Sequence, residues 1–119
     1  MAYRVPGFRF SLVALAAIDT GINNQYGNLA VDVNNAGLAV LPAAGGRIVG
    51  VIEDPCLAGE VVSVTKSGIV NIWAAGAVTA GADVQIDAAG MVLDAVAGTV
   101  IGVALEDSAA GELATILLV

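Results

Sequence analysis

The sequence contains no histidine and only one cysteine, Cys56, among its 119 residues. Without histidine the commonest general base and the commonest metal ligand are both missing, so the usual Ser and Cys triads and His-containing zinc sites are excluded. A single cysteine excludes an intrachain disulfide. Gly76 and Gly81 have the spacing of two phosphate-loop glycines, but Ala82 and Asp83 follow where Lys and Ser or Thr are needed. We therefore expect no enzyme, no catalytic residue and no cofactor.

Carboxylates are the remaining candidates for chemistry, because the chain has eleven Asp and Glu residues. Asp83 and Asp87 share one face of an expected strand, and Asp94 follows on the next strand of the same expected hairpin. This placement leaves a calcium site or a paired-acid site open. The spacing does not resemble that of a calcium-binding loop, so we expect solvated acids on an outer strand face and no bound metal.

Positive charge is scarce and unevenly distributed. After residue 18 the chain contains only Arg47 and Lys66 against eleven acids, whereas the first 18 residues contain Arg4 and Arg9 and no acid. Proteins bind nucleic acid mainly by neutralising phosphates with Lys and Arg. An acidic body with two basic residues is therefore not expected to bind nucleic acid.

Long hydrophobic runs are also missing, although 58% of the residues are hydrophobic and only 13% are charged. The longest run, residues 10–18, is half of the roughly 18 residues that a membrane-spanning helix requires, so we expect no membrane association. Soluble domains average about 45–50% apolar and about 25% charged residues. The surplus apolar surface of this chain favours contact with other proteins, and we expect a homo-oligomer.

Short Val- and Ile-rich runs follow one another along the chain, separated by Gly, Ala-Gly and Asn-rich turns. The predicted fold is all-β, a small compact β-barrel or sandwich of short strands with an extended N-terminal arm. We assign the arm and linker to residues 1–27 and a single β domain to residues 28–119. The runs that predict strands are residues 28–33, 38–41, 47–53, 60–66, 69–74, 83–87, 91–94, 99–106 and 112–119.

Two segments of this β domain repeat each other. Residues 47–64, RIVGVIEDPCLAGEVVSV, align at an offset of 52 with residues 99–116, TVIGVALEDSAAGELATI. Gly50 and Gly102 match within predicted strands, where each would admit a bulge or a close backbone approach. The two Ala-Gly-Glu units also match, and they predict turns in which glycine takes a positive φ. The repeat therefore predicts two strand-turn-strand units of the same design.

Aromatic residues are few, and three of the five lie in the basic N-terminal segment. Large rings beside arginines are typical of interface anchors, and Pro6-Gly7 discourages a continuous helix there. We expect this segment to be an extended arm that contacts a partner or a neighbouring subunit. Trp73 is expected in the core or in a subunit interface. The predicted contact residues are Tyr3, Arg4, Phe8, Arg9 and Phe10, together with Trp73.

Several motifs follow one another in a consistent order over about residues 45–119. They are Gly68-Ile-Val-Asn-Ile-Trp-Ala-Ala-Gly76, Val78-Thr-Ala-Gly-Ala-Asp-Val84, Asp87-Ala-Ala-Gly90, Ile101-Gly-Val-Ala-Leu-Glu106 and Ala109-Ala-Gly-Glu112. In this order and spacing they resemble the capsid cement, or head-decoration, proteins of tailed bacteriophages. The resemblance implies a small β-rich structural protein of the virion, in a family without catalytic residues.

The resemblance also implies a partner and a location. A protein of this family is expected to bind the major capsid protein on the outer capsid surface, often as a homotrimer at local three-fold positions. There it would stabilise the shell against internal DNA pressure. The alternative is a secreted or surface β-domain that binds a carbohydrate or a protein ligand, in which residues 1–17 are a cleaved signal sequence.

Overall fold

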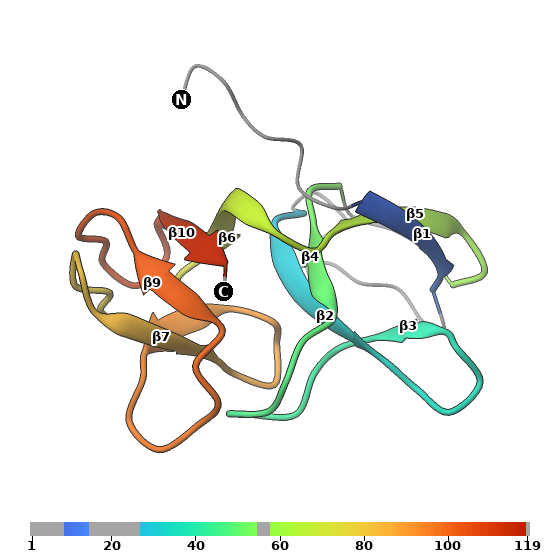
Figure 1. Ribbon diagram of the computed structural model, residues 1–119, viewed down its shortest axis with the longest axis horizontal. Coiled ribbons are helices and arrows are strands. Elements are labelled where there is room, and N and C mark those ends of the chain that lie inside the picture. Colours follow the sequence, from blue (N-terminus) through green and yellow to red (C-terminus); the bar gives the residue numbers. More distant parts are fainter. Residues whose placement is uncertain (1–8, 15–26, 55–57, 119) are drawn as a thin grey trace.

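The computed structural model of the protein describes residues 9–14, 27–54 and 58–118 (Figure 1). Every regular element in these residues is a β-strand, which confirms the all-β prediction. Within the same residues no helix is long and apolar enough to cross a membrane. The strands are β1 Arg9–Val13, β2 Leu29–Val33, β3 Ala39–Val40, β4 Gly50–Ile52, β5 Val61–Thr65, β6 Gly68–Trp73, β7 Asp83–Ile86, β8 Val92–Asp94, β9 Gly102–Ala104 and β10 Leu113–Leu118.

The first half of the protein, residues 9–65, forms an antiparallel sheet in the order β1-β5-β4-β2-β3, on the right in Figure 1. A bridge between Ala14 and Ala39 joins its two outer strands, so the sheet curls toward a closed barrel. Strand β1 lies within the segment that the sequence assigned to the N-terminal arm. It pairs with β5 along its whole length, so this part of the segment adds a strand to the sheet of its own chain.

The second half, residues 68–118, forms a sheet in the order β6-β10-β9-β7-β8. This arrangement matches the first half strand for strand, with β6 in the place of β1 and β10 in the place of β5. A bridge between Ala74 and Val92 again joins the two outer strands. Buried Val70 and Ile72 alternate with exposed neighbours along β6, because successive side chains of a strand point to opposite faces.

The repeat in the sequence is one part of a structural repeat, because the whole five-stranded unit occurs twice. Residues 47–64 contain β4 and most of β5, and residues 99–116 contain β9 and most of β10. The two copies therefore lie in different sheets. The glycines of the repeated Ala-Gly-Glu turns, Gly59 and Gly111, have φ values of +82° and +85°, which confirms the predicted turn chemistry.

Gly50 and Gly102 occupy the same place in the two halves. A Cβ atom at Gly50 would lie 2.6 Å from the backbone oxygen of Thr65, and one at Gly102 would lie closer still to the backbone oxygen of Leu117. Both positions are too close for a real Cβ atom. Neither glycine is among the residues with positive φ. The predicted close backbone approach is confirmed at both positions, and it alone requires glycine there.

The two halves share buried contacts. Ala30 and Val51 of the first half belong to the hydrophobic core of the second half. Backbone hydrogen bonds cross the same junction, because the Ala30 N–H donates to the Gly90 carbonyl at 2.9 Å and the Trp73 N–H donates to the Asn28 carbonyl at 3.1 Å. The halves are thus joined by apolar burial as well as by the connecting chain.

Candidate functional site

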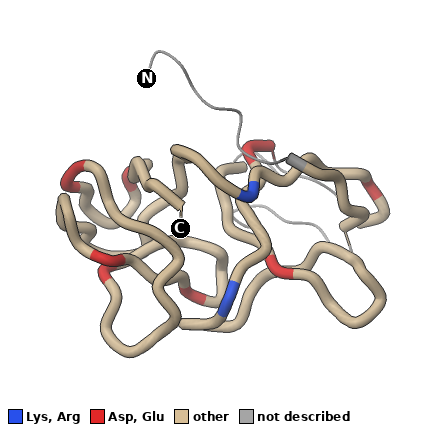
Figure 2. The backbone as a smooth tube through the Cα atoms, in the orientation of Figure 1, with Lys and Arg blue, Asp and Glu red and all other residues tan. Residues whose placement is uncertain are grey.

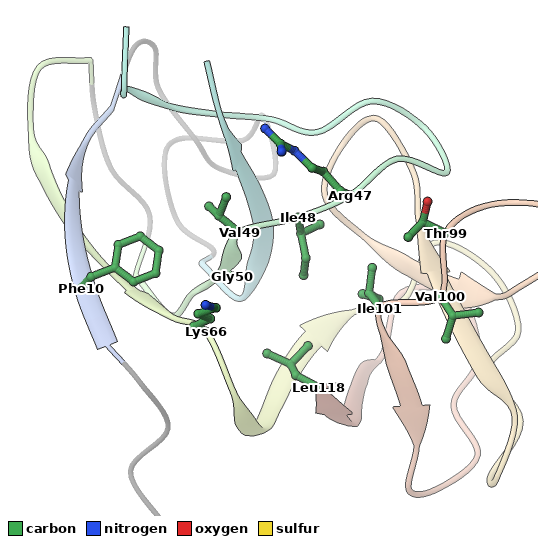
Figure 3. A pocket seen from close by; sticks show the side chains of 10 residues that line it. All are labelled: Phe10, Arg47, Ile48, Val49, Gly50, Lys66, Thr99, Val100, Ile101 and Leu118. Carbon is green, nitrogen blue, oxygen red and sulfur yellow. The ribbon is translucent and has the colours of Figure 1, made fainter. Parts of the chain in front are cut away.

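A pocket of about 390 Å³ lies between the two halves (Figure 3). Strand β1 and the segment that leads into β4 line it from the first half. The segment that leads into β9 and the end of β10 line it from the second half, and the turn that joins β5 to β6 completes it. The pocket is therefore built from segments that are far apart in the sequence.

Backbone hydrogen bonds fix the two segments that form most of the pocket wall. The Val49 N–H donates to the Val31 carbonyl at 2.8 Å, and at the equivalent place in the second half the Ile101 N–H donates to the Val84 carbonyl at 2.9 Å. The Thr99 N–H also donates across the junction, to the Gly45 carbonyl at 2.8 Å. The first two bonds fix each segment within its own half, and the third joins the halves beside the pocket.

Most of the pocket wall is apolar. Phe10 extends from β1 toward the cavity in Figure 3, and Ile48, Val49, Ile101 and Leu118 line it as well. An apolar wall of this kind can bury part of a partner's hydrophobic side chain.

Two cationic residues, Arg47 and Lys66, stand on this apolar wall. They are the Lys and Arg residues whose side chains fall within the described part of the chain, and both line the same pocket. Figure 2 shows them near the middle of the molecule, with acidic residues spread over both halves. Among the side chains that the structure describes, those at the pocket therefore supply the positive charge of an acidic molecule.

Asp32 positions the guanidinium of Arg47. The Arg47 Nε lies 3.2 Å from Asp32 Oδ1 and 3.4 Å from Oδ2, and 70% of the Arg47 side chain remains exposed. An exposed ion pair of this kind contributes about 0–1 kcal/mol to folding. A guanidinium has five N–H donors in a fixed fork, so one partner carboxylate leaves donors available for another.

The arrangement suits a partner with carboxylates beside apolar side chains. The two cationic groups would attract and orient the carboxylates, while the apolar wall would bury the neighbouring hydrophobic atoms. In the part of the chain that the structure describes, no group of His, Cys, Asp and Glu is arranged to hold a metal ion.

Two of the three acids that left a calcium site open, Asp87 and Asp94, are engaged in local contacts. Asp87 Oδ1 accepts hydrogen bonds from the N–H groups of Ala89 and Met91 at 2.9 and 3.0 Å. Asp94 accepts one from the Thr79 N–H at 2.9 Å and one from the Thr79 hydroxyl at 2.7 Å. These two carboxylates stabilise turns and loops of the second half.

Of the six residues predicted from the sequence to make contacts, one lines the pocket. Phe10 is half-buried in its wall, whereas Trp73 is half-buried against the core cluster of the first half. The backbone of Arg9 belongs to β1, and its side chain lies outside the described part. The remaining three, Tyr3, Arg4 and Phe8, lie outside the described residues. The contact role of all six stays a prediction.

Arg47 and Lys66 were not among the contact residues predicted from the sequence. The signal that identifies them is their scarcity, because they are the only basic residues after residue 18. Because they are 19 positions apart, the sequence does not indicate that both line one pocket.

Comparisons with known proteins agree with the fold. The crystal structure of the head fiber gp8.5 N base of bacteriophage phi29 superposes with a TM-score of 0.72, covering 94% of this chain and 93% of that chain at 17% sequence identity. This likeness shows the fold. A search of curated protein sequences finds no match.

The profile of the phage cement protein family matches residues 14–119. This match covers most of the chain, including all strands from β2 to β10. It agrees with the resemblance seen in the motif order and favours the virion over the secreted β-domain. The chain therefore belongs to the phage cement protein family and is a structural, capsid-associated protein of the virion.

Proposed function

We propose that the protein binds the outer surface of a phage capsid as a homotrimer and stabilises the shell. Its family supports a capsid-associated role. The observation that carries the proposed binding mode is the gathering of Arg47 and Lys66 on one apolar-walled pocket of an otherwise acidic molecule. The major capsid protein is the partner, and it presents a segment with carboxylates and apolar side chains to this pocket.

The N-terminal segment is proposed to extend this docking surface. Phe10 lines the pocket, and Tyr3, Arg4, Phe8 and Arg9 precede it in the chain. An aromatic and basic segment can anchor on a partner by filling apolar pockets and pairing with acids. Trp73 is proposed as a contact of the same assembly, through the part of its side chain that stays accessible.

The binding mode is tested by neutralising the two cations in the double variant Arg47→Gln/Lys66→Gln. Binding to undecorated capsid shells is measured by co-sedimentation over a series of salt concentrations. We expect the affinity to fall by about tenfold or more and to depend less on salt, because the variant has lost two of the charged groups whose pairing salt screens. Thermal unfolding verifies that the variant folds.

A matched control changes the net charge by the same two units outside the pocket. Ala58→Glu/Ala110→Glu places two acids in exposed turns, and it is expected to bind shells nearly as the wild type does. Equal losses in both double variants would mean that net charge, and not the pocket, governs binding. If the wild-type protein itself does not bind shells, the proposed function is wrong.

The role of the N-terminal segment needs a separate variant. Deletion of residues 2–8 leaves β1, which begins at Arg9, intact. We expect the deletion variant to fold and to bind shells with lower affinity. Unchanged affinity would restrict the docking surface to the β domain.

A further inference from the structure

The matching topology of the halves makes their surfaces comparable residue by residue. Across the first sheet, Thr65, Val51 and Ala30 are directly paired on neighbouring strands β5, β4 and β2. The same pairing in the second sheet joins Leu117, Val103 and Asp83 on β10, β9 and β7. We call these the first row and the second row.

The first row is covered. Ala30 and Val51 are 0% exposed and Thr65 is 4% exposed. Ala30 and Val51 belong to the hydrophobic core of the second half, so the first row packs against the second half of its own chain. The first row is therefore covered by the second half of the same chain.

The second row is open. Leu117 is 41% exposed, and its neighbour Ile69, which is paired with it on β6, is 40% exposed. Leu105 and Leu113 are exposed large hydrophobic side chains of adjoining positions. Side chains two apart on a strand share a face, so Leu105 and Leu113 lie on the face of the second row, separated from Leu117 and Ile69 by Thr115 and its hydrogen-bond partner Asn71. Exposed apolar side chains on one sheet face are typical of an interaction site.

The surface of the second half that packs against the first row has an equivalent in the first half. In the second half it includes Gly90, whose carbonyl accepts the Ala30 N–H, and Trp73, whose N–H donates to Asn28. At the equivalent places in the first half, a Cβ atom added at Gly37 would have no neighbouring atom within 4 Å, and Val13 is 38% exposed.

We propose that the second row docks on the first half of a second copy of this chain, around Val13 and Gly37. The contact repeats between molecules the contact that joins the two halves within one molecule. This inference rests on the proposed homo-oligomer and specifies its interface. Asp83 stands where the first row has Ala30, so the contact centres on Ile69, Leu117 and Val103.

Such a contact is head-to-tail, because each copy uses one surface to donate and a different one to receive. A head-to-tail interface closes into a ring when its rotation allows and otherwise extends into a filament. A homotrimer is the ring of three such contacts. The interface is therefore compatible with the proposed oligomer and excludes a two-fold symmetric pair through the second row.

Two variants separate the donating from the receiving surface. Leu117→Glu places a carboxylate in the second row, and Val13→Glu places one on the receiving surface. Sedimentation velocity at micromolar concentration should show assembly by the wild type and a loss of at least about tenfold in self-association for each variant, because a buried unpaired charge opposes association. Val96→Glu, at an exposed loop residue outside both surfaces, is the matched control and should assemble normally.

Mixing the two variants is the decisive step. Each keeps the surface that the other has lost, so one intact contact forms per pair and the mixture should yield a one-to-one dimer and nothing larger. If Leu117→Glu fails to fold, Ile69→Glu, at the exposed residue paired with Leu117 on β6, takes its place.

The outcomes distinguish this interface from the proposed oligomer. Assembly of both variants as strongly as the wild type would overturn the interface and leave the homo-oligomer standing. A mixture that stays monomeric would overturn the head-to-tail geometry. A wild type that is monomeric both in solution and on shells would overturn the homo-oligomer itself.

Discussion

The two halves of the protein share their strand order and several backbone hydrogen bonds, but their surface side chains differ. The Ala14 N–H donates to the Glu60 carbonyl in the first half, and the Ala74 N–H donates to the Glu112 carbonyl in the second, at 2.9 and 2.8 Å. The return bonds, from Gly59 to Ala14 and from Gly111 to Ala74, are repeated as well. What the halves share is backbone pairing and glycine geometry, so these features define the fold.

The difference between the halves is concentrated where the candidate site lies. Gln85 Oε1 in the second half accepts hydrogen bonds from the N–H groups of Val96 and Gly98, at 2.9 and 2.8 Å. At the equivalent position of the first half, Asp32 pairs with Arg47 instead. One half uses this position to hold a loop, and the other uses it to hold a cation at the pocket. The cation at the candidate site is therefore held by a side chain that breaks the repeat.

The largest expected effect comes from the two glycines that the halves share. In Gly50→Ala and in Gly102→Ala the new methyl group would overlap backbone atoms of the neighbouring strand. We expect each change to lower the free energy of unfolding by about 3 kcal/mol, because neither strand can move without disturbing the buried core. Urea denaturation followed by circular dichroism measures the loss.

Gly76→Ala is the matched control for these two variants. A Cβ at Gly76 would meet only Leu93 at 3.7 Å, an ordinary contact distance, so its stability should change by less than about 1 kcal/mol. If Gly50→Ala and Gly102→Ala differ from each other by more than they differ from this control, the halves are not equivalent at these positions.

Substitution of a second pair of glycines tests the contact between the halves. Gly37 and Gly90 both have a φ of +80°, but a Cβ at Gly90 would lie 2.6 Å from the Ala30 oxygen, whereas one at Gly37 would meet nothing. The backbone strain of Gly→Ala, about 1 kcal/mol, is common to both. We expect Gly90→Ala to be more destabilising than Gly37→Ala by about 2 kcal/mol in the same assay.

Equal losses in Gly37→Ala and Gly90→Ala would contradict the close contact between the halves at this turn. The comparison is internal, because both variants introduce the same methyl group at the same φ. It therefore isolates the contact with Ala30 from the conformational cost.

The smallest expected effect concerns the turns that carry these glycines. Asn34 Oδ1 accepts hydrogen bonds from the N–H groups of Ala36 and Leu38, as Asp87 Oδ1 does from Ala89 and Met91. Asn34→Ala and Asp87→Ala should each lower the free energy of unfolding by about 1 kcal/mol. The exchanges Asn34→Asp and Asp87→Asn keep the accepting oxygen and should change stability by less than about half of that. If thermal unfolding shows a loss of stability in only one of the two alanine variants, the two turns are not equivalent.

The strands and turns were predictable from the sequence because they depend on local chemistry. The alternation in residues 60–66 and the glycines of the Ala-Gly-Glu turns are visible without knowledge of neighbouring strands. The matching positions of Gly50 and Gly102 predicted either a bulge or a close backbone approach, and the structure shows the close approach. The topology of the first half was harder to predict. Strand β1 has the same place in its sheet as β6 has in the other sheet, but the two strands differ in sequence.

The pocket was not predictable, because it depends on how two units pack. Arg47 and Lys66 are on opposite sides of β4 and β5 in the chain, and only the folded sheets bring them to one cavity with Leu118. The exposure of Leu117 was equally unpredictable from the sequence, because the equivalent Thr65 is buried. Such differences arise from the junction between the units and have no local sequence signal.

The proposed docking of the pocket on the capsid is tested most directly by a cryo-electron microscopy reconstruction of shells decorated with the wild-type protein. We predict density for the protein on the outer surface, with the pocket that contains Arg47 and Lys66 facing the major capsid protein. A reconstruction in which this pocket faces solvent would contradict the proposed docking.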